Sequence, residues 1–313
     1  MSQNLSTHPS SRSRGRRSLV RAGALALALA SAGQAAAQDS VTTTQLADDL
    51  YLLQAGRDGN VVLSLSEHSA VLVDAQTAAA APAVAAAVAG LADVPVEMVL
   101  TTHYHDDHLG GNEYFRSRGA TVLSHSNVPR QASADTFIAA LNWTRKAAKP
   151  EALPDELIEL DLEIRPGGRA ISVFHFPAAH TDGDLGVFFP VANVLHAGDI
   201  VEIGAYPFVD WWAGGSLDGM IEAVGRISEI ADEETKIVPG HGAVIDRAQL
   251  LAYLEMLTVV RERLAAALQR EDDLETIMLN SPVAEFDAEN GGPAAGRRFV
   301  GVLYLGLTGD HTP

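Results

Sequence analysis

A short segment between an apolar run and a diglycine carries three histidines and two aspartates, the side chains that bind divalent metals. It reads His103-Tyr104-His105-Asp106-Asp107-His108. In an extended chain, side chains two positions apart point the same way, so the first two histidines can bind one ion. A turn into helix at Gly110-Gly111 would bring Asp107 and His108 to a second ion close by. A polar loop whose histidines only cap and hydrogen-bond is the alternative, but three histidines with carboxylates between them favour a metal site.

The strands predicted around this segment end in residues that can bind a metal. The metal-binding segment follows an apolar strand at 96–101, and open α/β sheets place their chemistry at such strand ends. Asp74, His180, Asp199 and His241 also follow apolar stretches. The strands are predicted at 50–54, 61–66, 70–74, 96–101, 120–124, 157–164, 170–176, 186–189, 193–196 and 236–238.

Helical patterns separate these strands and complete an α/β chain in two similar halves. Ser216 is expected to be the N-cap of the helix at 217–230. The helices are predicted at 78–91, 112–118, 133–146, 217–230, 246–269, 272–279 and 299–307, with a loose segment at 290–297. A length of 313 residues allows one large α/β domain. We therefore expect one domain over 38–313, with C-terminal helices and its site along one edge.

The first 37 residues have the composition of a cleaved export signal. Five arginines precede the apolar stretch 22–30, and Ala35-Ala36-Ala37 offers a cleavage site. The segment Arg16-Arg17-Ser18-Leu19-Val20 also resembles a twin-arginine signal. The apolar stretch is too short and too rich in alanine for a membrane anchor. We expect a periplasmic or secreted protein without stable membrane insertion.

Charge and the lack of cysteine restrict the partners and the ligands. The chain has 22 Lys and Arg against 40 Asp and Glu, and removal of five arginines with the signal leaves a net charge of −23. Such a surface repels phosphate backbones, so nucleic acid is not expected as a partner. Since the chain has no cysteine, histidine and carboxylate alone must bind the metal. The oligomeric state is not predicted.

Four motifs together resemble the metallo-β-lactamase superfamily, in residue type and in order along the chain. They are the loop at 103–108, His180, Gly198-Asp199 and the turn Pro239-Gly240-His241-Gly242, and the resemblance spans residues 50–242. It implies a four-layer αββα sandwich, in which two mixed β-sheets lie face to face with helices outside. It implies a first metal on His103, His105 and His180, a second on Asp107, His108 and His241, and Asp199 as the bridge between them. Asp74 would orient the ligand loop, with a helix N-cap as its alternative role.

The resemblance also implies a chemistry and a kind of substrate. Two zinc ions, with iron or manganese as alternatives, would hold a bridging hydroxide that attacks the carbonyl of a small ester, lactone, thioester or amide. Asp107 would relay a proton. The aromatic residues of the loop 200–215 are expected either to form an apolar wall for the substrate or only to pack the loop down: Tyr206, Phe208, Trp211 and Trp212. Tyr206 is also a candidate donor to a developing oxyanion.

Two departures from the best-known β-lactamases favour the general hydrolase branch. Asp199 stands where those enzymes have cysteine, and Glu202 stands where they have a lysine that binds the substrate carboxylate. A β-lactamase remains an alternative because of the export signal and the His180-Thr181-Asp182-Gly183 region. An iron thiol or persulfide oxygenase is a further alternative, and a metal-storing or ligand-binding periplasmic protein is the alternative that is not an enzyme. Four histidines match no motif position, and of these His196 is expected to pack under the site: His68, His125, His175 and His196.

Overall fold

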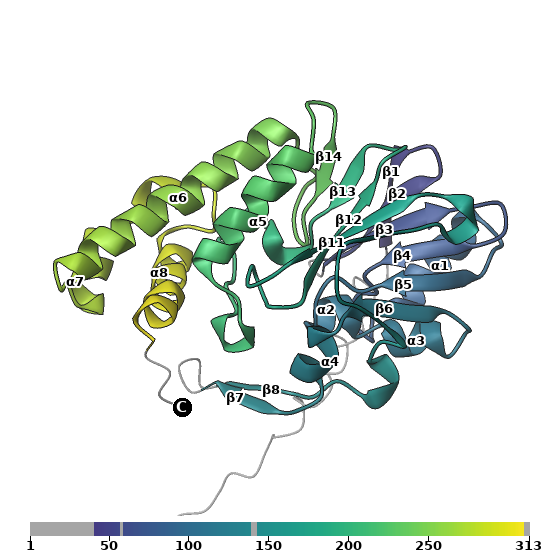
Figure 1. The fold of residues 1–313 in the computed structure, drawn as a ribbon, viewed down its shortest axis with the longest axis horizontal. Helices are drawn as coiled ribbons and strands as arrows, with labels where there is room; N and C mark the ends of the chain where they lie inside the picture. Colours follow the sequence, from purple (N-terminus) through teal and green to yellow (C-terminus); the bar gives the residue numbers. More distant parts are fainter. Residues whose placement is uncertain (1–40, 57–58, 139–142, 310–313) are drawn as a thin grey trace, which may run out of the picture. The chain divides into compact units, whose positions relative to one another are not determined.

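Two β-sheets lie face to face in the computed structural model, which describes residues 41–56, 59–138 and 143–309 (Figure 1). The predicted export signal lies outside these residues. The first sheet has the order β1-β2-β3-β4-β5-β6-β9. Its strands are β1 (Val41–Ala47), β2 (Leu50–Ala55), β3 (Asn60–Leu65), β4 (Ala70–Val73), β5 (Val96–Leu100), β6 (Thr121–His125) and β9 (Glu156–Ile158).

The second sheet has five strands in the order of the sequence, β10-β11-β12-β13-β14. They are β10 (Leu162–Ile164), β11 (Ile171–Phe176), β12 (Asp184–Phe189), β13 (Val194–His196) and β14 (Lys236–Val238). Strands β1 to β4 pair antiparallel, whereas β4, β5, β6 and β9 pair parallel. In the second sheet only the β13–β14 pair is parallel. Both sheets are therefore mixed, as the resemblance implied.

Three apolar clusters correspond to the three interfaces between four layers. Val84 of α1 (Ala81–Leu91) and Phe115 of α3 (Asn112–Arg116) pack on the outer face of the first sheet. Val62 and Val187 belong to the cluster between the sheets. The outer face of the second sheet is covered by α5 (Leu217–Ile230) and α6 (Arg247–Gln269). The predicted αββα sandwich is confirmed, because each sheet buries one face on the other sheet and one on helices.

The remaining helices are short or lie at the C-terminal end. They are α2 (Asp106–Leu109), α4 (Asn127–Ala132), α7 (Leu274–Asn280) and α8 (Pro293–Thr308). Helix α8 begins within the segment that was expected to be loose. Ser216 caps α5 as predicted, since its side chain accepts a hydrogen bond from the Gly219 amide at 2.9 Å.

The helix predicted at 133–146 is wrong. Helix α4 ends at Ala132, and a hairpin of β7 (Thr136–Ile138) and β8 (Trp143–Arg145) follows beside it (Figure 1). Tertiary contacts determine the conformation of this segment and override its helix propensity. The buried Arg145 side chain donates hydrogen bonds to the Gln131 carbonyl at 2.9 Å and to the Thr136 hydroxyl at 3.0 Å. The predicted strand 157–164 is also divided, between β9 and β10 in different sheets.

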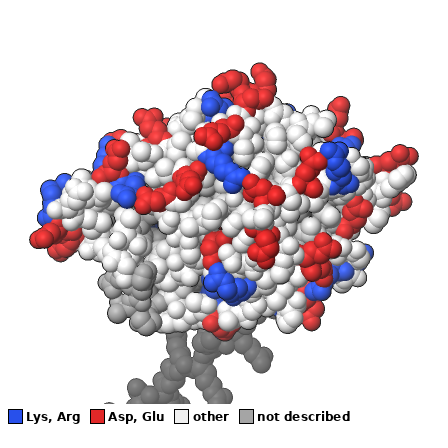
Figure 2. Space-filling model, in the orientation of Figure 1, with Lys and Arg blue, Asp and Glu red and all other residues white. Residues whose placement is uncertain are grey.

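The surface is acidic, and carboxylates are spread over the face shown in Figure 2 with fewer basic side chains among them. Many of the basic side chains are paired, as Arg261 is with Asp218 at 2.7 Å. In the described part of the chain, no helix has the length and apolar composition that crossing a membrane requires.

Candidate metal centre

Strand ends bring the seven predicted ligands together at one edge of the sandwich. His103 and His105 follow β5, His180 follows β11, Asp199 follows β13 and His241 follows β14. Asp107 and His108 lie in α2, which begins at Asp106. The turn into helix thus comes before the diglycine, not at it as expected. Because the chain turns into α2 after His105, the side chains of Asp107 and His108 still lie in a different ligand set from those of His103 and His105.

The first set of side chains converges on one point. The ligand atoms of His103, His105, His180 and Asp199 lie within 4.8 Å of one another. His180 Nε2 is 3.1 Å from His105 Nδ1, and His103 Nε2 is 3.6 Å from Asp199 Oδ2. Nitrogen and oxygen atoms of this kind and spacing can surround one divalent ion.

The second set lies on the other side of Asp199. The ligand atoms of Asp107, His108 and His241 also lie within 4.8 Å of one another. Asp199 Oδ1 is 3.2 Å from His108 Nε2 and 3.6 Å from His241 Nε2, while Asp199 Oδ2 faces the first set. One carboxylate therefore presents one oxygen to each set. Gly240 makes room for it, because a Cβ there would lie 1.9 Å from Asp199 Oδ1.

Buried polar atoms at the centre of the cluster lack hydrogen bonds. His103 Nε2, His108 Nε2 and Asp199 Oδ1 are buried and make no hydrogen bond of acceptable geometry with the described residues. Such atoms cost free energy unless something satisfies them. Cations between the two sets would accept all three lone pairs, so the residues present fit a dinuclear metal site.

The outward nitrogens of four imidazoles each have a partner that orients the ring. Metal-binding histidines in proteins usually have such a partner, which fixes the tautomer. The pairs are His103 Nδ1 with Thr102 Oγ1 (3.1 Å), His105 Nε2 with Asp210 Oδ2 (3.2 Å), His108 Nδ1 with Asp74 Oδ2 (2.7 Å) and His180 Nδ1 with the Phe208 carbonyl (2.5 Å). The inward nitrogens are therefore held ready to bind.

Asp74 is fully buried directly beneath the ligand loop. Its carboxylate accepts hydrogen bonds from the Thr102 amide at 2.7 Å and the Thr102 hydroxyl at 2.9 Å, besides its contact with His108. The N-cap of α1 is Ala80, so the alternative role of Asp74 as a helix cap is wrong. Asp74 instead connects the end of β4 to the loop after β5.

Of the histidines without a motif position, His196 lies deepest. Its Nδ1 accepts a hydrogen bond from the Gly198 amide at 3.0 Å, and its Nε2 is 3.8 Å from Asp74 Oδ2. It therefore packs under the site, as expected. His125 and His175 stack on each other with ring centroids 3.6 Å apart, and His68 is exposed.

The electrostatics of the cluster favour bound cations. Burial lowers the pKa of His180 to about 4, and burial likewise lowers the pKa of His103. Both rings are thus neutral, which is the form that binds metals. Burial opposes charge on His241, but its hydrogen bond to Asp107 and the negative charges of Asp199 and Asp107 together outweigh burial and raise the pKa of His241 to about 9. Metal ions bound by this second set would take the place of such protons, so metal binding should release protons.

Three residues of the site were missed by the sequence analysis. Asp210 accepts hydrogen bonds from the Tyr104 hydroxyl and the His105 ring, and Arg145 donates to the Tyr104 hydroxyl. All three are at least nine-tenths buried. The three residues have no regular spacing in the sequence. The signal that could have been used is Asp210, an acidic residue within the aromatic loop 200–215. Together they fix the ring of His105 from behind.

Asp210→Asn should weaken metal binding at the first set about 10- to 100-fold, because the ring of His105 loses its anionic partner. Metal affinity measured by competition with a chromophoric chelator checks this. Tyr104→Phe is the matched variant, since it removes one hydroxyl from the same network and leaves the bond from His105 to Asp210 in place. Equal affinities for Asp210→Asn and the wild type would contradict this role.

The four predicted aromatic residues do not form one wall. The Phe208 ring centroid is 6.2 Å from those of His105 and His180, so it faces the site. Trp212 stacks behind Phe208, and Trp211 stacks on Trp212 beside Gly306 of α8. These two tryptophans pack the loop down, which was the alternative expectation.

Tyr206 is not in the site. It is buried against Phe299 of α8 with ring centroids 4.9 Å apart. Its hydroxyl donates to the Val283 carbonyl at 2.9 Å and lies 2.9 Å from Asp287 Oδ1. The proposed role as donor to an oxyanion is therefore wrong, because the hydroxyl is already used in the C-terminal segment.

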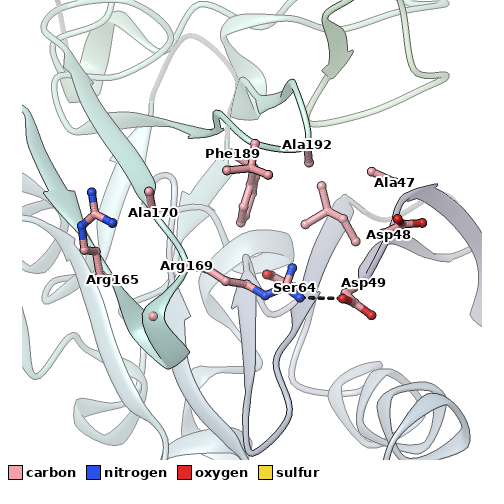
Figure 3. A pocket seen from close by; sticks show the side chains of 12 residues that line it. Ala47, Asp48, Asp49, Ser64, Arg165, Arg169, Ala170, Phe189 and Ala192 are labelled. Carbon is pink, nitrogen blue, oxygen red and sulfur yellow. Dashed lines mark hydrogen bonds and ion pairs between the residues drawn. The ribbon is translucent and has the colours of Figure 1, made fainter.

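Two of the cavities in the described structure differ in their relation to the metal cluster. One, of about 530 Å³, is lined by His105, Asp107 and Phe208 together with the β7–β8 hairpin. The other, of about 610 Å³, lies at the opposite ends of the strands, where Arg169 pairs with Asp49 at 2.6 Å (Figure 3). Only the first is next to residues that could do chemistry.

The sequence profile of the Metallo-beta-lactamase superfamily matches residues 55–242, which is more than half of the chain. The chain therefore belongs to this superfamily. The match includes all seven members of the two ligand sets.

Relatives and solved structures agree with this assignment. Metallo-beta-lactamase IND-1 of Chryseobacterium indologenes is 26% identical over 149 residues, which cover 48% of this chain and 56% of that protein. Metallo-beta-lactamase type 2 of Bacillus cereus is 26% identical over 169 residues, covering 51% and 57%. The chain thus spans little more than half the length of these relatives. The structure of the metallo-beta-lactamase from Pontibacter korlensis superposes with a TM-score of 0.57 at 20% identity, covering 70% of this chain and 99% of that chain, and shows the same fold.

Proposed function

We propose that this protein is an exported, dinuclear zinc hydrolase that cleaves a small carbonyl compound such as an ester, lactone, thioester or amide. The observation that carries the proposal is the pair of ligand sets joined through Asp199. Export is proposed from the arginine-rich start and the alanine-rich apolar stretch that follows it.

The donor set agrees with zinc. His103, His105 and His180 with Asp199 would hold one ion, and Asp107, His108 and His241 with Asp199 would hold the other. Zinc accepts imidazole and carboxylate ligands in low coordination numbers and leaves a position open in catalytic sites. When bound, two such ions supply a nucleophile by lowering the pKa of water toward 7 and polarise the carbonyl oxygen of the substrate.

The protein's own groups would orient the reaction and move its proton. Asp107 is partly exposed beside the cavity, and its Oδ2 lies 3.0 Å from His241 Nε2. It can therefore pass a proton to the leaving group. Asp74 and Asp210 keep the histidine rings in place from behind. Phe208 excludes water on the side of the first ligand set.

Glu202 selects against anionic substrates in this proposal. Its half-buried carboxyl is close enough to Asp199, His241 and Asp107 for their charges to act on it. Burial, followed by the charge of Asp199, raises the pKa of Glu202 to about 7. In its ionised form, which is favoured above that pH, this carboxyl repels an anion such as the carboxylate of a penicillin. Neutral esters and lactones fit the site better than β-lactams do.

Metal analysis combined with a substrate panel tests the proposal. We expect two zinc ions per mature chain, loss of hydrolysis when a chelator removes them, and recovery when zinc is added back. The panel contains neutral lactones, esters and thioesters, a neutral amide and a β-lactam. Iron with oxygen consumption on a thiol or persulfide would overturn the hydrolase in favour of an oxygenase. A protein that binds metal but hydrolyses nothing in the panel would contradict it as well.

A further inference from the structure

The cavity next to the metal cluster has a wall that comes from the β7–β8 hairpin. Besides Tyr104, His105, Asp107 and Phe208, it is lined by the residues of β8 and the segment after it, up to Ala148. Its volume of about 530 Å³ falls in the range of small-molecule sites. A substrate whose carbonyl lies at the metal cluster would therefore place its substituent against the hairpin.

The hairpin presents two aromatic residues in opposite directions. Trp143 pairs with Ile138, and Phe137 pairs with Thr144, so Trp143 and Phe137 lie on different faces of the two strands. Arg145 and Ile138 are buried, which shows that the face of Trp143 is turned toward the protein. Trp143 lines the cavity and keeps 51% of its surface exposed, whereas Phe137 does not line it and is 58% exposed.

Arg145 fixes this wall relative to the metal ligands. Its guanidinium donates to the Gln131 carbonyl, to Thr136 Oγ1 and to the Tyr104 hydroxyl, and it lies over the ring of Tyr104 at 4.4 Å. Tyr104 in turn donates to Asp210, the partner of His105. Hydrogen bonds through Tyr104 and Asp210 therefore connect the hairpin to His105 of the first ligand set. Trp143 lies two residues before Arg145 on the same strand, so this network also positions Trp143.

The basic groups that line the cavity are already engaged. Arg145 is used in the network just described, and Lys146 pairs with Asp135 at 2.6 Å. Asp107 adds a carboxylate to the same cavity. An anionic substituent would find no free cation among the described residues of this wall, whereas Trp143 and Phe208 offer flat apolar surfaces to a neutral, planar group.

We propose that Trp143 and Phe208 form the subsite for a neutral, planar apolar substituent, so that the substrates are aryl-bearing neutral esters or lactones. This inference rests on the proposed hydrolase function. Trp143 acts here as a specificity-determining residue, and it takes no part in the bond-breaking step.

Hydrolysis of two matched esters by the zinc-loaded mature protein tests the subsite. The probes are the ethyl esters of acetic and phenylacetic acid, which differ by one phenyl ring on the acyl side and carry no other ring; acid release is followed by titration at constant pH. Trp143→Ala should lower kcat/KM for the phenylacetyl ester about 10- to 100-fold and change that for the acetyl ester less than about 3-fold. Trp143→Phe should recover most of the loss, because it restores a planar ring.

Phe137→Ala is the matched control, since it removes an aromatic ring from the other face of the same hairpin and should leave both esters unchanged. Equal losses on both esters with Trp143→Ala, or equal losses with Phe137→Ala, would overturn the subsite while the hydrolase stands. A protein that cleaves neither ester is tested by calorimetric titration with phenylacetamide and acetamide. Tighter binding of phenylacetamide that Trp143→Ala abolishes supports the subsite without turnover, and equal binding of the two amides overturns it.

Discussion

Asp199→Asn is expected to reduce hydrolysis by at least about 10³-fold and to leave at most one metal ion per chain. The amide keeps the shape of the side chain but removes the negative charge that faces both ligand sets, with Oδ2 at 3.6 Å from His103 Nε2 and Oδ1 at 3.2 Å from His108 Nε2. Without that charge no carboxylate of the protein would lie between two closely spaced cations. Metal content by elemental analysis and kcat/KM on the best substrate of the panel measure the effect.

Asp218→Asn is the control for this substitution. It makes the same chemical change at an exposed position in α5, where Asp218 pairs only with Arg261, and surface pairs of this kind contribute about 1 kcal/mol or less. It should keep two metals and full activity. Two metals and more than a tenth of the activity in the Asp199→Asn protein would show that the carboxylate does not join the two sites.

Asp74→Asn is expected to have the second largest effect, on folding as well as on metal binding. The carboxylate is fully buried and accepts from the Thr102 amide, the Thr102 hydroxyl and the His108 ring. An amide must turn its NH₂ toward one of these donors. We expect the free energy of unfolding to fall by about 2 to 4 kcal/mol, and metal affinity at the second set to fall about 10- to 100-fold.

Denaturant unfolding of the metal-free protein separates the two effects, because it measures stability in the absence of the ions. Thr102→Val is the matched variant: it removes one of the three hydrogen bonds to Asp74, together with the partner of His103 Nδ1, and keeps the charge on Asp74. It should cost about 1 to 2 kcal/mol and change metal affinity at the second set little. A larger loss of metal affinity at the second set in Thr102→Val than in Asp74→Asn would refute the orienting role of the carboxylate.

The ligand sets could be predicted from sequence because their signals are local and repeated. Five of the seven ligands follow the end of an apolar strand and the other two lie in the short helix α2 that follows β5, and strand polarity brings such ends to one edge. The spacing of His103 and His105 indicated a shared ion, and the structure places both in one set. Whether these residues bind zinc in the protein stays a prediction.

The errors have physical reasons of a different kind. Ala139, Ala140 and Leu141 favour helix, but the hairpin that replaces the predicted helix depends on hydrogen bonds from Arg145 to residues outside it. In the sequence, all four aromatic residues of the loop 200–215 are equally plausible as the wall of a substrate pocket. Tyr206 packs against α8 and donates to the Val283 carbonyl, whereas Phe208 lies beside the ring of His105. Contacts between distant segments leave no periodic trace in the sequence.

The anchoring of Tyr206 has a consequence for how the protein is made. The loop that follows Asp199 is bound through this side chain to Val283, Asp287 and Phe299, all beyond the part that matches the superfamily. Synthesis proceeds from the N-terminus, so the histidines emerge from the ribosome well before the residues that hold this loop. A nascent chain ending at 242 would carry every ligand and still lack the anchor for Tyr206. This anchor of the loop after Asp199 is therefore formed only when the last helix is in place.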